Sequence, residues 1–276
     1  KIAIVFVILA LAIAVFSANA YAKDAQGKVT ISGIAPTITG TALWNEDGAD
    51  DDITLEAGGD VVVTANATVR DLDGGDTIAS ASATLSHGGV TITNGSCDLS
   101  GADTYNRTVT CSFTMPYYSA AGTWTANITA TDDDANSVSG QDTQDVGESI
   151  ALDVLESTID FDEMSPGENS TDPANVTIQN LGNVALDTYY TGDNYSCTVG
   201  SIPVGNMKYN NTAGSYDDMT GTAMTESSVQ DADFSLAAST DGTNATDLEF
   251  FTIAIPSVGE IAGTCTNTVT IDAQTP

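Results

Sequence analysis

The sequence predicts a mainly β protein in which an apolar N-terminal α-helix precedes two antiparallel β-sandwich domains of similar size. Three observations support this fold class. Residues 2–16 contain only Ile, Val, Leu, Ala and Phe. Beyond residue 27 the apolar residues recur with a period of two, in short segments separated by Gly-rich and Asp-rich turns. Two of the four cysteines fall in each half of the remaining chain. We expect a helix at residues 1–27, a first sandwich at 28–140, a linker at 141–149 and a second sandwich at 150–276.

The apolar N-terminal segment is long enough, if helical, to cross the hydrocarbon core of a bilayer, at about 1.5 Å per residue. It fits a membrane span, a secretory signal peptide that ends in the small residues of 18–22, or a retained assembly helix. Because the chain begins at Lys1 and not at a methionine, we expect a processed N-terminus and a retained helix. The expected assembly residues are Ile2, Ile4, Val5, Phe6, Ile8, Leu9, Leu11, Ile13, Val15 and Phe16.

The charge balance restricts the partners of this protein. Thirty-eight Asp and Glu residues against six Lys and Arg residues give a net charge of −32. So acidic a surface argues against nucleic acid and against anionic headgroups as partners, and makes cations the natural counterpart. Charged residues nevertheless make up only 16% of the chain, and the other polar residues are mostly Thr, Ser, Asn and Gly. This composition is typical of extracellular β domains.

The four cysteines are Cys97, Cys111, Cys197 and Cys265. An even number of cysteines in an exported chain predicts two disulfides and an oxidising compartment. Three pairings satisfy that number, and pairing within each half is the simplest. Zinc is a poor alternative, because no two cysteines have the CxxC spacing and His87 is the only histidine.

Asn-X-Ser/Thr sequons are more frequent than the composition predicts by chance, although a chain rich in Thr and Asn forms some of them freely. None has proline at the middle position, so all can accept an N-linked glycan in an exported protein. We expect heavy N-glycosylation. The sequons begin at Asn66, Asn94, Asn106, Asn127, Asn169, Asn175, Asn194, Asn210 and Asn244.

The first sandwich is predicted from segments that alternate apolar and polar residues, with Trp124 in its core. The expected strands are 28–32, 60–70, 77–86, 89–93, 104–114 and 123–131. The stretch Tyr117–Trp124 followed by Asn127–Asp132 resembles the closing strands of PKD-like and other immunoglobulin-like modules of archaeal and bacterial surface proteins. The resemblance covers roughly residues 55–140 and implies a fold, not an activity.

The second sandwich is predicted in the same way. Its expected strands are 150–154, 175–179, 187–191, 196–199, 233–237, 247–255 and 263–271. The ending Ile255–Ile271 resembles the last hairpin of exported immunoglobulin-like surface domains, which implies that the C-terminus is a strand and not a tail. With these two resemblances we expect both sandwiches to be immunoglobulin-like. Segment 141–149 is polar, contains Gly and is poor in apolar residues, as a linker would be.

Acidic turns are the candidates for a bound ion. Asp71, Asp73 and Asp76 alternate around a Gly-Gly turn, and carboxylate oxygens suit Ca²⁺. The stretch departs from an EF-hand loop, because Ser82 stands where that loop needs Glu. Acidic turns without a metal are the commoner case in so acidic a chain. We therefore name Ca²⁺ and N-linked glycans as the only candidate non-protein groups, with no cofactor certain.

Catalysis has little support in the sequence. The only histidine, His87, stands beside Gly88 and Gly89 without a nucleophile motif, and the chain has neither a GxSxG element nor a phosphate-binding loop. Paired carboxylates arise by chance among so many acids. We expect that the protein is not an enzyme.

An apolar N-terminal helix joined directly to a glycosylated, disulfide-bonded β domain resembles archaeal type IV pilins and archaellins. The resemblance implies a structural subunit of an extracellular filament: the helix anchors the subunit in the membrane before assembly and then packs with its copies. Position 5 is Val5, where bacterial pilins usually carry Glu, so a salt bridge of that kind is not available. The resemblance also implies that the β domains face outward. Two β domains exceed the single one usual in that family, which leaves the outer domain free to form a sheath or to bind a surface or carbohydrate ligand.

Two other functions remain open. The first is a secreted surface-layer or biofilm-fibre glycoprotein that has lost residues 1–22 as a signal peptide, in which residues 28–32 form a free strand that completes a neighbouring sheet. The second is a Ca²⁺-dependent carbohydrate-binding module on a membrane stalk.

Overall fold

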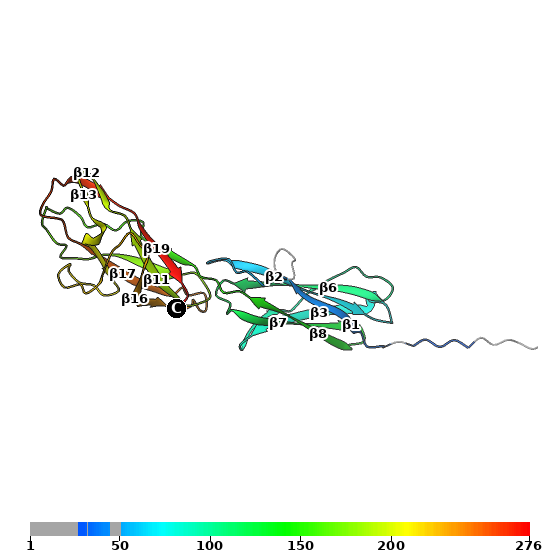
Figure 1. Cartoon of the computed structure of the whole chain (residues 1–276). Coiled ribbons are helices and arrows are strands. Elements are labelled where there is room, and N and C mark those ends of the chain that lie inside the picture. The colour runs from blue at the N-terminus through cyan, green and yellow to red at the C-terminus, as the bar shows by residue number, and fades with distance from the viewer. Residues whose placement is uncertain (1–26, 32, 45–50) are drawn as a thin grey trace, which may run out of the picture. The chain divides into compact units, whose positions relative to one another are not determined.

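A computed structural model describes residues 27–31, 33–44 and 51–276 of the chain. The chain forms two units, residues 1–33 and residues 34–276. The expected assembly helix, with Ile2 to Phe16, lies outside the described residues. Within the described ranges the helices are two single 3₁₀ turns, η1 (Gly75–Thr77) and η2 (Val204–Asn206), and neither could span a membrane. The expectation of a mainly β fold is confirmed (Figure 1).

The first sandwich consists of two four-stranded antiparallel sheets, with the strand orders β1-β2-β6-β5 and β4-β3-β7-β8. Its strands are β1 (Thr37–Trp44), β2 (Asp60–Arg70), β3 (Ile78–His87), β4 (Val90–Asn94), β5 (Asp98–Ser100), β6 (Asn106–Pro116), β7 (Gly122–Asp132) and β8 (Ser137–Val146). Strand β2 pairs with β6 along its whole length. Figure 1 shows β2 and β6 in one layer and β3, β7 and β8 in the other.

The core of the first sandwich is formed by strands in which buried and outward-facing residues alternate. Every second residue of β2, from Val61 to Val69, is buried, while the residues between them face outward or are half-buried. Phe113 and Met115 of β6 and Trp124 of β7 are buried in the same cluster. Trp124 therefore occupies the core position that the sequence predicted.

The segment expected to be a linker is mostly strand. Strand β8 runs to Val146 and pairs with β7 from Ser137 to Val146. Residues 141–146 thus belong to the first sandwich, and that part of the expected linker 141–149 is wrong. The physical reason is that β8 needs few apolar residues: it is an edge strand whose side chains are exposed or half-buried up to Val146.

The second sandwich contains three antiparallel sheets, with the orders β15-β14-β17-β10-β9, β16-β11-β19 and β13-β12-β18. Its strands are β9 (Leu152–Val154), β10 (Ala174–Asn180), β11 (Leu186–Gly192), β12 (Tyr195–Val199), β13 (Ser201–Ile202), β14 (Met207–Asn210), β15 (Thr222–Ala223), β16 (Val229–Leu236), β17 (Thr246–Ile253), β18 (Ala262–Thr266) and β19 (Val269–Gln274).

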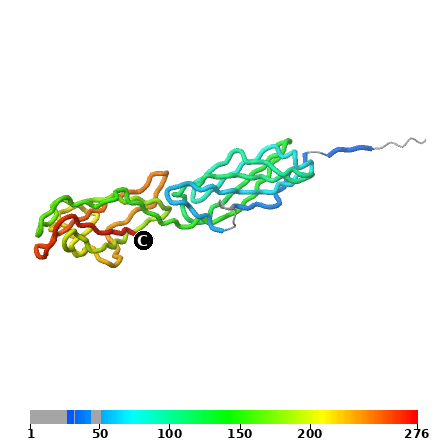
Figure 2. Tube along the Cα trace, turned by 90° about the horizontal axis from the view of Figure 1, so that it is seen from above, coloured from blue at the N-terminus to red at the C-terminus, as the bar shows by residue number. Residues whose placement is uncertain are grey.

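The core of the second sandwich joins the five-stranded sheet to the sheet of β16, β11 and β19. One hydrophobic cluster contains Val176 and Phe251 from the five-stranded sheet and Tyr190 and Phe234 from the other. The last strand, red in Figure 2, pairs with β11 and is not a tail, as expected from the sequence.

Two expected strands differ from the structure. Residues 28–31 have no strand partner among the described residues. The single strand expected at 263–271 is two strands, β18 and β19, because Asn267 and Thr268 break the pairing and the chain moves from β12 to β11. Sequence patterns also missed β1, β5, β13, β14 and β15, which are short or alternate weakly.

Candidate functional site

Two large apolar side chains are left exposed at the start of the described chain. Val29 is 83% exposed and Ile31 is 73% exposed. They alternate in sequence with Lys28 and Thr30, so in a strand they would share one face. Residues 28–31 therefore expose two apolar side chains that could form the apolar face of a strand.

A groove opens on one side of the second sandwich. Two adjoining hollows of about 590 and about 620 Å³ share Ile159, Asp160, Tyr195, Thr264 and Cys265. The apolar side chains of the first hollow are Val154, Ile159, Val176, Tyr195, Val269 and Ile271. Those of the second include Phe161, Met164, Ile202, Ile253 and Ile255. Most of these residues belong to or pack against the hydrophobic core, so the groove reaches the interior of the sandwich.

Unpaired strand edges border this groove. Strand β9 covers only the last three residues of β10, Ile178 to Asn180. Beyond them, Leu155 N–H still donates to Thr177 C=O at 3.0 Å, but Thr177 N–H donates to the Glu156 carboxylate. On the opposite side, β18 pairs with β12 alone among the described strands, and β19 with β11 alone. The edges of β18 and β19 can therefore accept a strand, whereas on β10 an added strand would have to displace the Glu156 carboxylate from Thr177 N–H.

Residues 156–164 lie over the groove without forming a strand. Ile159, Phe161 and Met164 are half-buried against the core, while Asp160 and Asp162 between them are exposed. Asp162 has a left-handed backbone, with φ of 57°. In the described structure, no backbone group of 156–164 bonds to the backbone of another element. The segment is thus held by its apolar side chains and by the hydrogen bonds of the Glu156 carboxylate, without backbone pairing to another element.

The rim of the groove is acidic. Glu156, Asp160, Asp162 and Glu163 line it and are exposed. Hydrogen bonds from the N–H of Thr177 and then from its hydroxyl lower the pKa of Glu156. Glu156 is therefore a negative charge held at the edge of β10 by its bonds to Thr177.

The core of the second sandwich also buries two carboxylates that sequence reasoning missed. Glu249 on β17 is fully buried, and Asp231 on β16 is 5% exposed. Desolvation by burial, followed by the charge of Asp231, raises the pKa of Glu249 to about 8. Burial likewise raises the pKa of Asp231. The alternation of the strand could have predicted the burial of Glu249, because Glu249 lies on the same strand face as the buried Phe251 and Ile253.

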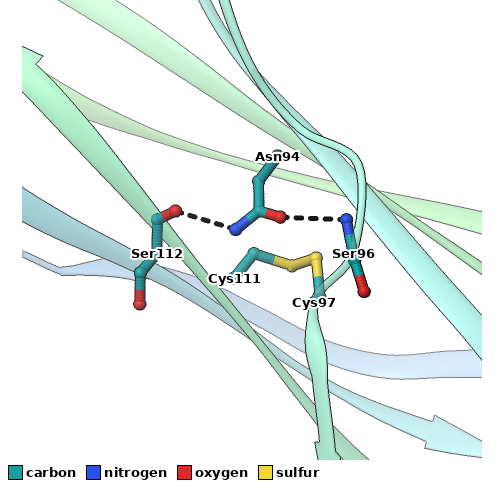
Figure 3. Close-up of a disulfide and its surroundings, with 5 residues drawn as sticks. All are labelled: Asn94, Ser96, Cys97, Cys111 and Ser112. Carbon is teal, nitrogen blue, oxygen red and sulfur yellow. Dashed lines mark hydrogen bonds between the residues drawn. A yellow bond between two sulfur atoms is a disulfide. The ribbon is translucent and has the colours of Figure 1, made fainter.

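The two disulfides join the cysteines within each half. Cys97 and Cys111 are both buried in the first core, 4.5 Å apart at Cα. Figure 3 shows this bridge beside Asn94, whose side chain donates to Ser112 C=O at 2.8 Å and accepts from Ser96 N–H at 3.0 Å. Cys197 and Cys265, which face each other across β12 and β18, are half-buried. Two disulfides indicate that the chain folds in an oxidising compartment, as is typical of extracellular and surface proteins.

The nine sequon asparagines differ in exposure. Asn175 and Asn194 are exposed; Asn66, Asn94, Asn106, Asn127, Asn169, Asn210 and Asn244 are half-buried. The side-chain oxygens of Asn66 and Asn127 are buried without a hydrogen-bond partner. N-glycosylation stays a prediction, and the structure ranks its sites.

Two of the three aspartates predicted to bind Ca²⁺, Asp71 and Asp73, accept hydrogen bonds from protein groups. Asp71 is buried and accepts hydrogen bonds from Asp73 N–H at 2.9 Å and from the Thr77 hydroxyl at 3.0 Å. Asp73 accepts from Ile34 N–H at 2.7 Å. Among the described residues no three His, Cys, Asp or Glu side chains are grouped to hold a metal, and this includes Asp71, Asp73 and Asp76. Calcium binding stays a prediction.

His87 contacts two neighbouring residues of β7, Thr123 and Trp124. Its Nδ1 lies 2.8 Å from the carbonyl oxygen of Thr123, and its ring stacks on Trp124 with centroids 5.5 Å apart. These contacts place the imidazole against the first core. The expectation that the protein is not an enzyme stays a prediction.

No protein-family model and no curated protein matches the sequence. Solved structures match it only distantly. The C-terminal domain of the Streptococcus agalactiae AgI/II polypeptide BspA is 10% identical with a TM-score of 0.29, over 87% of this chain and 96% of that one. The CsuC–CsuE chaperone–tip adhesion subunit complex of Acinetobacter baumannii Csu pili is 10% identical with a TM-score of 0.34, over 86% of this chain and 92% of that one.

A chaperone–tip adhesin complex of CFA/I fimbriae gives a similar result. It is 8% identical with a TM-score of 0.34, over 89% of this chain and 90% of that one. With TM-scores below 0.5, these likenesses assign this chain neither to a family nor to a function.

Proposed function

We propose that this chain is a structural subunit of an extracellular filament, similar to those of archaeal type IV pilins. In this proposal the subunit polymerises through its N-terminal segment, residues 1–27, and exposes glycosylated, immunoglobulin-like β domains for adhesion. Its partners are further copies of itself, the membrane before assembly, and a surface or carbohydrate ligand. The role is structural and not catalytic.

One observation carries this proposal. The apolar side chains of Val29 and Ile31, which follow the apolar N-terminal sequence after the polar stretch 23–28, are exposed, in a chain whose other described residues form a disulfide-bonded β fold. Exposed apolar surface of this kind is stabilised when a membrane or another chain covers it. In a filament, neighbouring subunits provide that cover.

Filaments shed from cells that produce this protein test the proposal. Negative-stain microscopy together with mass spectrometry should find filaments composed of this chain, and N-terminal sequencing should find that the mature subunit retains the apolar residues 2–16. Finding only a soluble monomer on the cell surface and in the medium would contradict the proposal.

In residues 28–31 the exposed apolar side chains of Val29 and Ile31 alternate with polar residues, which favours a second candidate function. Here the chain is a secreted fibre glycoprotein that assembles by strand exchange after residues 1–22 have been removed. The same N-terminal sequencing distinguishes the two candidates, because the mature chain would then begin near Lys23.

A further inference from the structure

We infer that the groove of the second sandwich accepts residues 28–31 of a second copy of this chain as an added β-strand. The inference rests on the second candidate function and names the acceptor site that strand exchange requires. Its partner is another molecule of the same protein, which contributes an extended segment with one apolar face.

The first step concerns backbone pairing. Strand β9 ends opposite Ile178, and beyond it the edge of β10 is bonded only at Thr177, to Leu155 N–H and to the Glu156 carboxylate. Among the described strands, the outer edges of β18 and β19 are unpaired across the groove. A strand that enters between these edges gains backbone hydrogen bonds with at least one of them. Residues 156–164 occupy this place now without such bonds among the described residues.

The second step concerns the side chains. Val29 and Ile31 project to one face of the incoming strand, with the spacing that Ile159 and Phe161 have in the segment that covers the groove. The incoming pair can therefore replace Ile159 and Phe161 over the apolar floor. This exchange removes Val29 and Ile31, 83% and 73% exposed, from water.

The third step concerns charge. Lys28 is one of only six basic residues in the chain, and it directly precedes Val29. Glu156, Asp160, Asp162 and Glu163 line the groove. A segment led by Lys28 is attracted to this acidic rim, whereas most of the surface of so acidic a chain is repelled by it.

Binding of a peptide to the full chain tests the groove directly. The probe is a fluorescent peptide of residues 27–35, and its binding is measured by anisotropy. We expect saturable binding that weakens as salt is raised. A peptide with Val29→Asp and Ile31→Asp should bind about tenfold or more weakly, whereas the matched Thr30→Asp control should keep more of the affinity, because Thr30 faces away.

A variant of the groove locates the binding site. Phe161→Ser loosens the covering segment and should increase peptide affinity by about threefold or more, since the peptide then displaces fewer contacts. Equal binding of the unsubstituted peptide and the peptide with Val29→Asp and Ile31→Asp, or no effect of Phe161→Ser, would overturn the inference.

Assembly of the full chain separates this inference from the proposed function. Under the inference, the chain with Val29→Asp and Ile31→Asp stays monomeric in light scattering while the Thr30→Asp chain assembles. If both variants form filaments as the wild type does, the filament function stands and strand exchange fails. If the wild type forms no filament but binds the peptide saturably at the groove, the filament function fails and the acceptor site stands.

Discussion

Glu249 on β17 lies close enough to Tyr190 on β11 for its negative charge to raise the pKa of the tyrosine hydroxyl, and both side chains are fully buried. Burial of Tyr190 is the larger cause of that shift. The Tyr190 hydroxyl and both Glu249 oxygens lack a partner with hydrogen-bond geometry among the described residues. A carboxyl group in this environment is more stable with its proton than without it.

The stability of the protein should therefore fall as the pH rises. The pKa of Glu249 is about 8 in the folded chain, against 4.5 for an ordinary glutamate. Between these values the unfolded chain releases a proton that the folded chain retains, so ionisation favours unfolding. The loss over this window is at most about 5 kcal/mol, at about 1.4 kcal/mol per pKa unit. Urea unfolding at pH 5, 7 and 9 measures it.

The Glu249→Gln variant provides the control. It should lose most of this pH dependence and should be more stable than the wild type at pH 9, because Gln carries no charge. The exposed Glu163→Gln substitution should leave the pH dependence unchanged. An unaltered pH profile in Glu249→Gln would show that another group causes the effect.

The two disulfides should respond in a fixed order to a mild reductant. Cys197 and Cys265 are half-buried, whereas Cys97 and Cys111 are buried in the first core, so the reductant reaches the first pair sooner. Alkylation during a time course, followed by mass spectrometry, should label Cys197 and Cys265 first. Simultaneous labelling of all four cysteines would instead indicate that global unfolding exposes them together.

Loss of each disulfide should also differ in its effect on stability. Cys197 and Cys265 are 68 residues apart in sequence, and Cys97 and Cys111 are 14 residues apart. In the chain-entropy model their loss costs about 4 and about 3 kcal/mol, respectively. Cys197→Ala/Cys265→Ala should therefore destabilise the protein more than Cys97→Ala/Cys111→Ala. Denaturant unfolding of both double variants measures the two losses.

Glycan occupancy should follow exposure if glycosylation acts on the folded chain. Asn175 and Asn194 have exposed side chains and should be the most fully occupied sequons. Asn66 and Asn127 should be the least occupied, because their side-chain oxygens are buried. Glycopeptide mass spectrometry of protein from its native host gives the occupancies. Equal occupancy at Asn66 and Asn175 would indicate that glycans are added before folding.

Calcium binding at the turn of Asp71, Asp73 and Asp76 can be tested separately from the structural role of Asp71. The Asp71→Ala variant should be destabilised by about 1–3 kcal/mol with or without Ca²⁺, because it leaves Asp73 N–H without its acceptor and leaves the Thr77 hydroxyl only Gly74 C=O. If the turn also binds Ca²⁺, the melting temperature of the wild type should rise with Ca²⁺ and fall with a chelator. Asp76→Asn, at a matched position that lacks these two bonds, should then remove the Ca²⁺ response.

Much of the fold could be predicted because half-buried strands alternate whatever their partners are. The pattern from Asp60 to Arg70 gave the bounds of β2, and the buried Trp124 followed from the same alternation. Strand β8 could not be predicted from the pattern, because an edge strand needs few apolar residues. The groove could not be predicted either, since it depends on where β9 ends beside β10.

The sequence by itself determined the period-two pattern, the acidic charge, the sequons and the even number of cysteines, since each is a property of local order or composition. Only the tertiary structure decided that Glu249 is buried beside Tyr190 and that β9 pairs with only part of β10. It also decided that Val29 and Ile31 are exposed. These three features depend on which strands pair and which sheets face each other, and residues distant in sequence fix both.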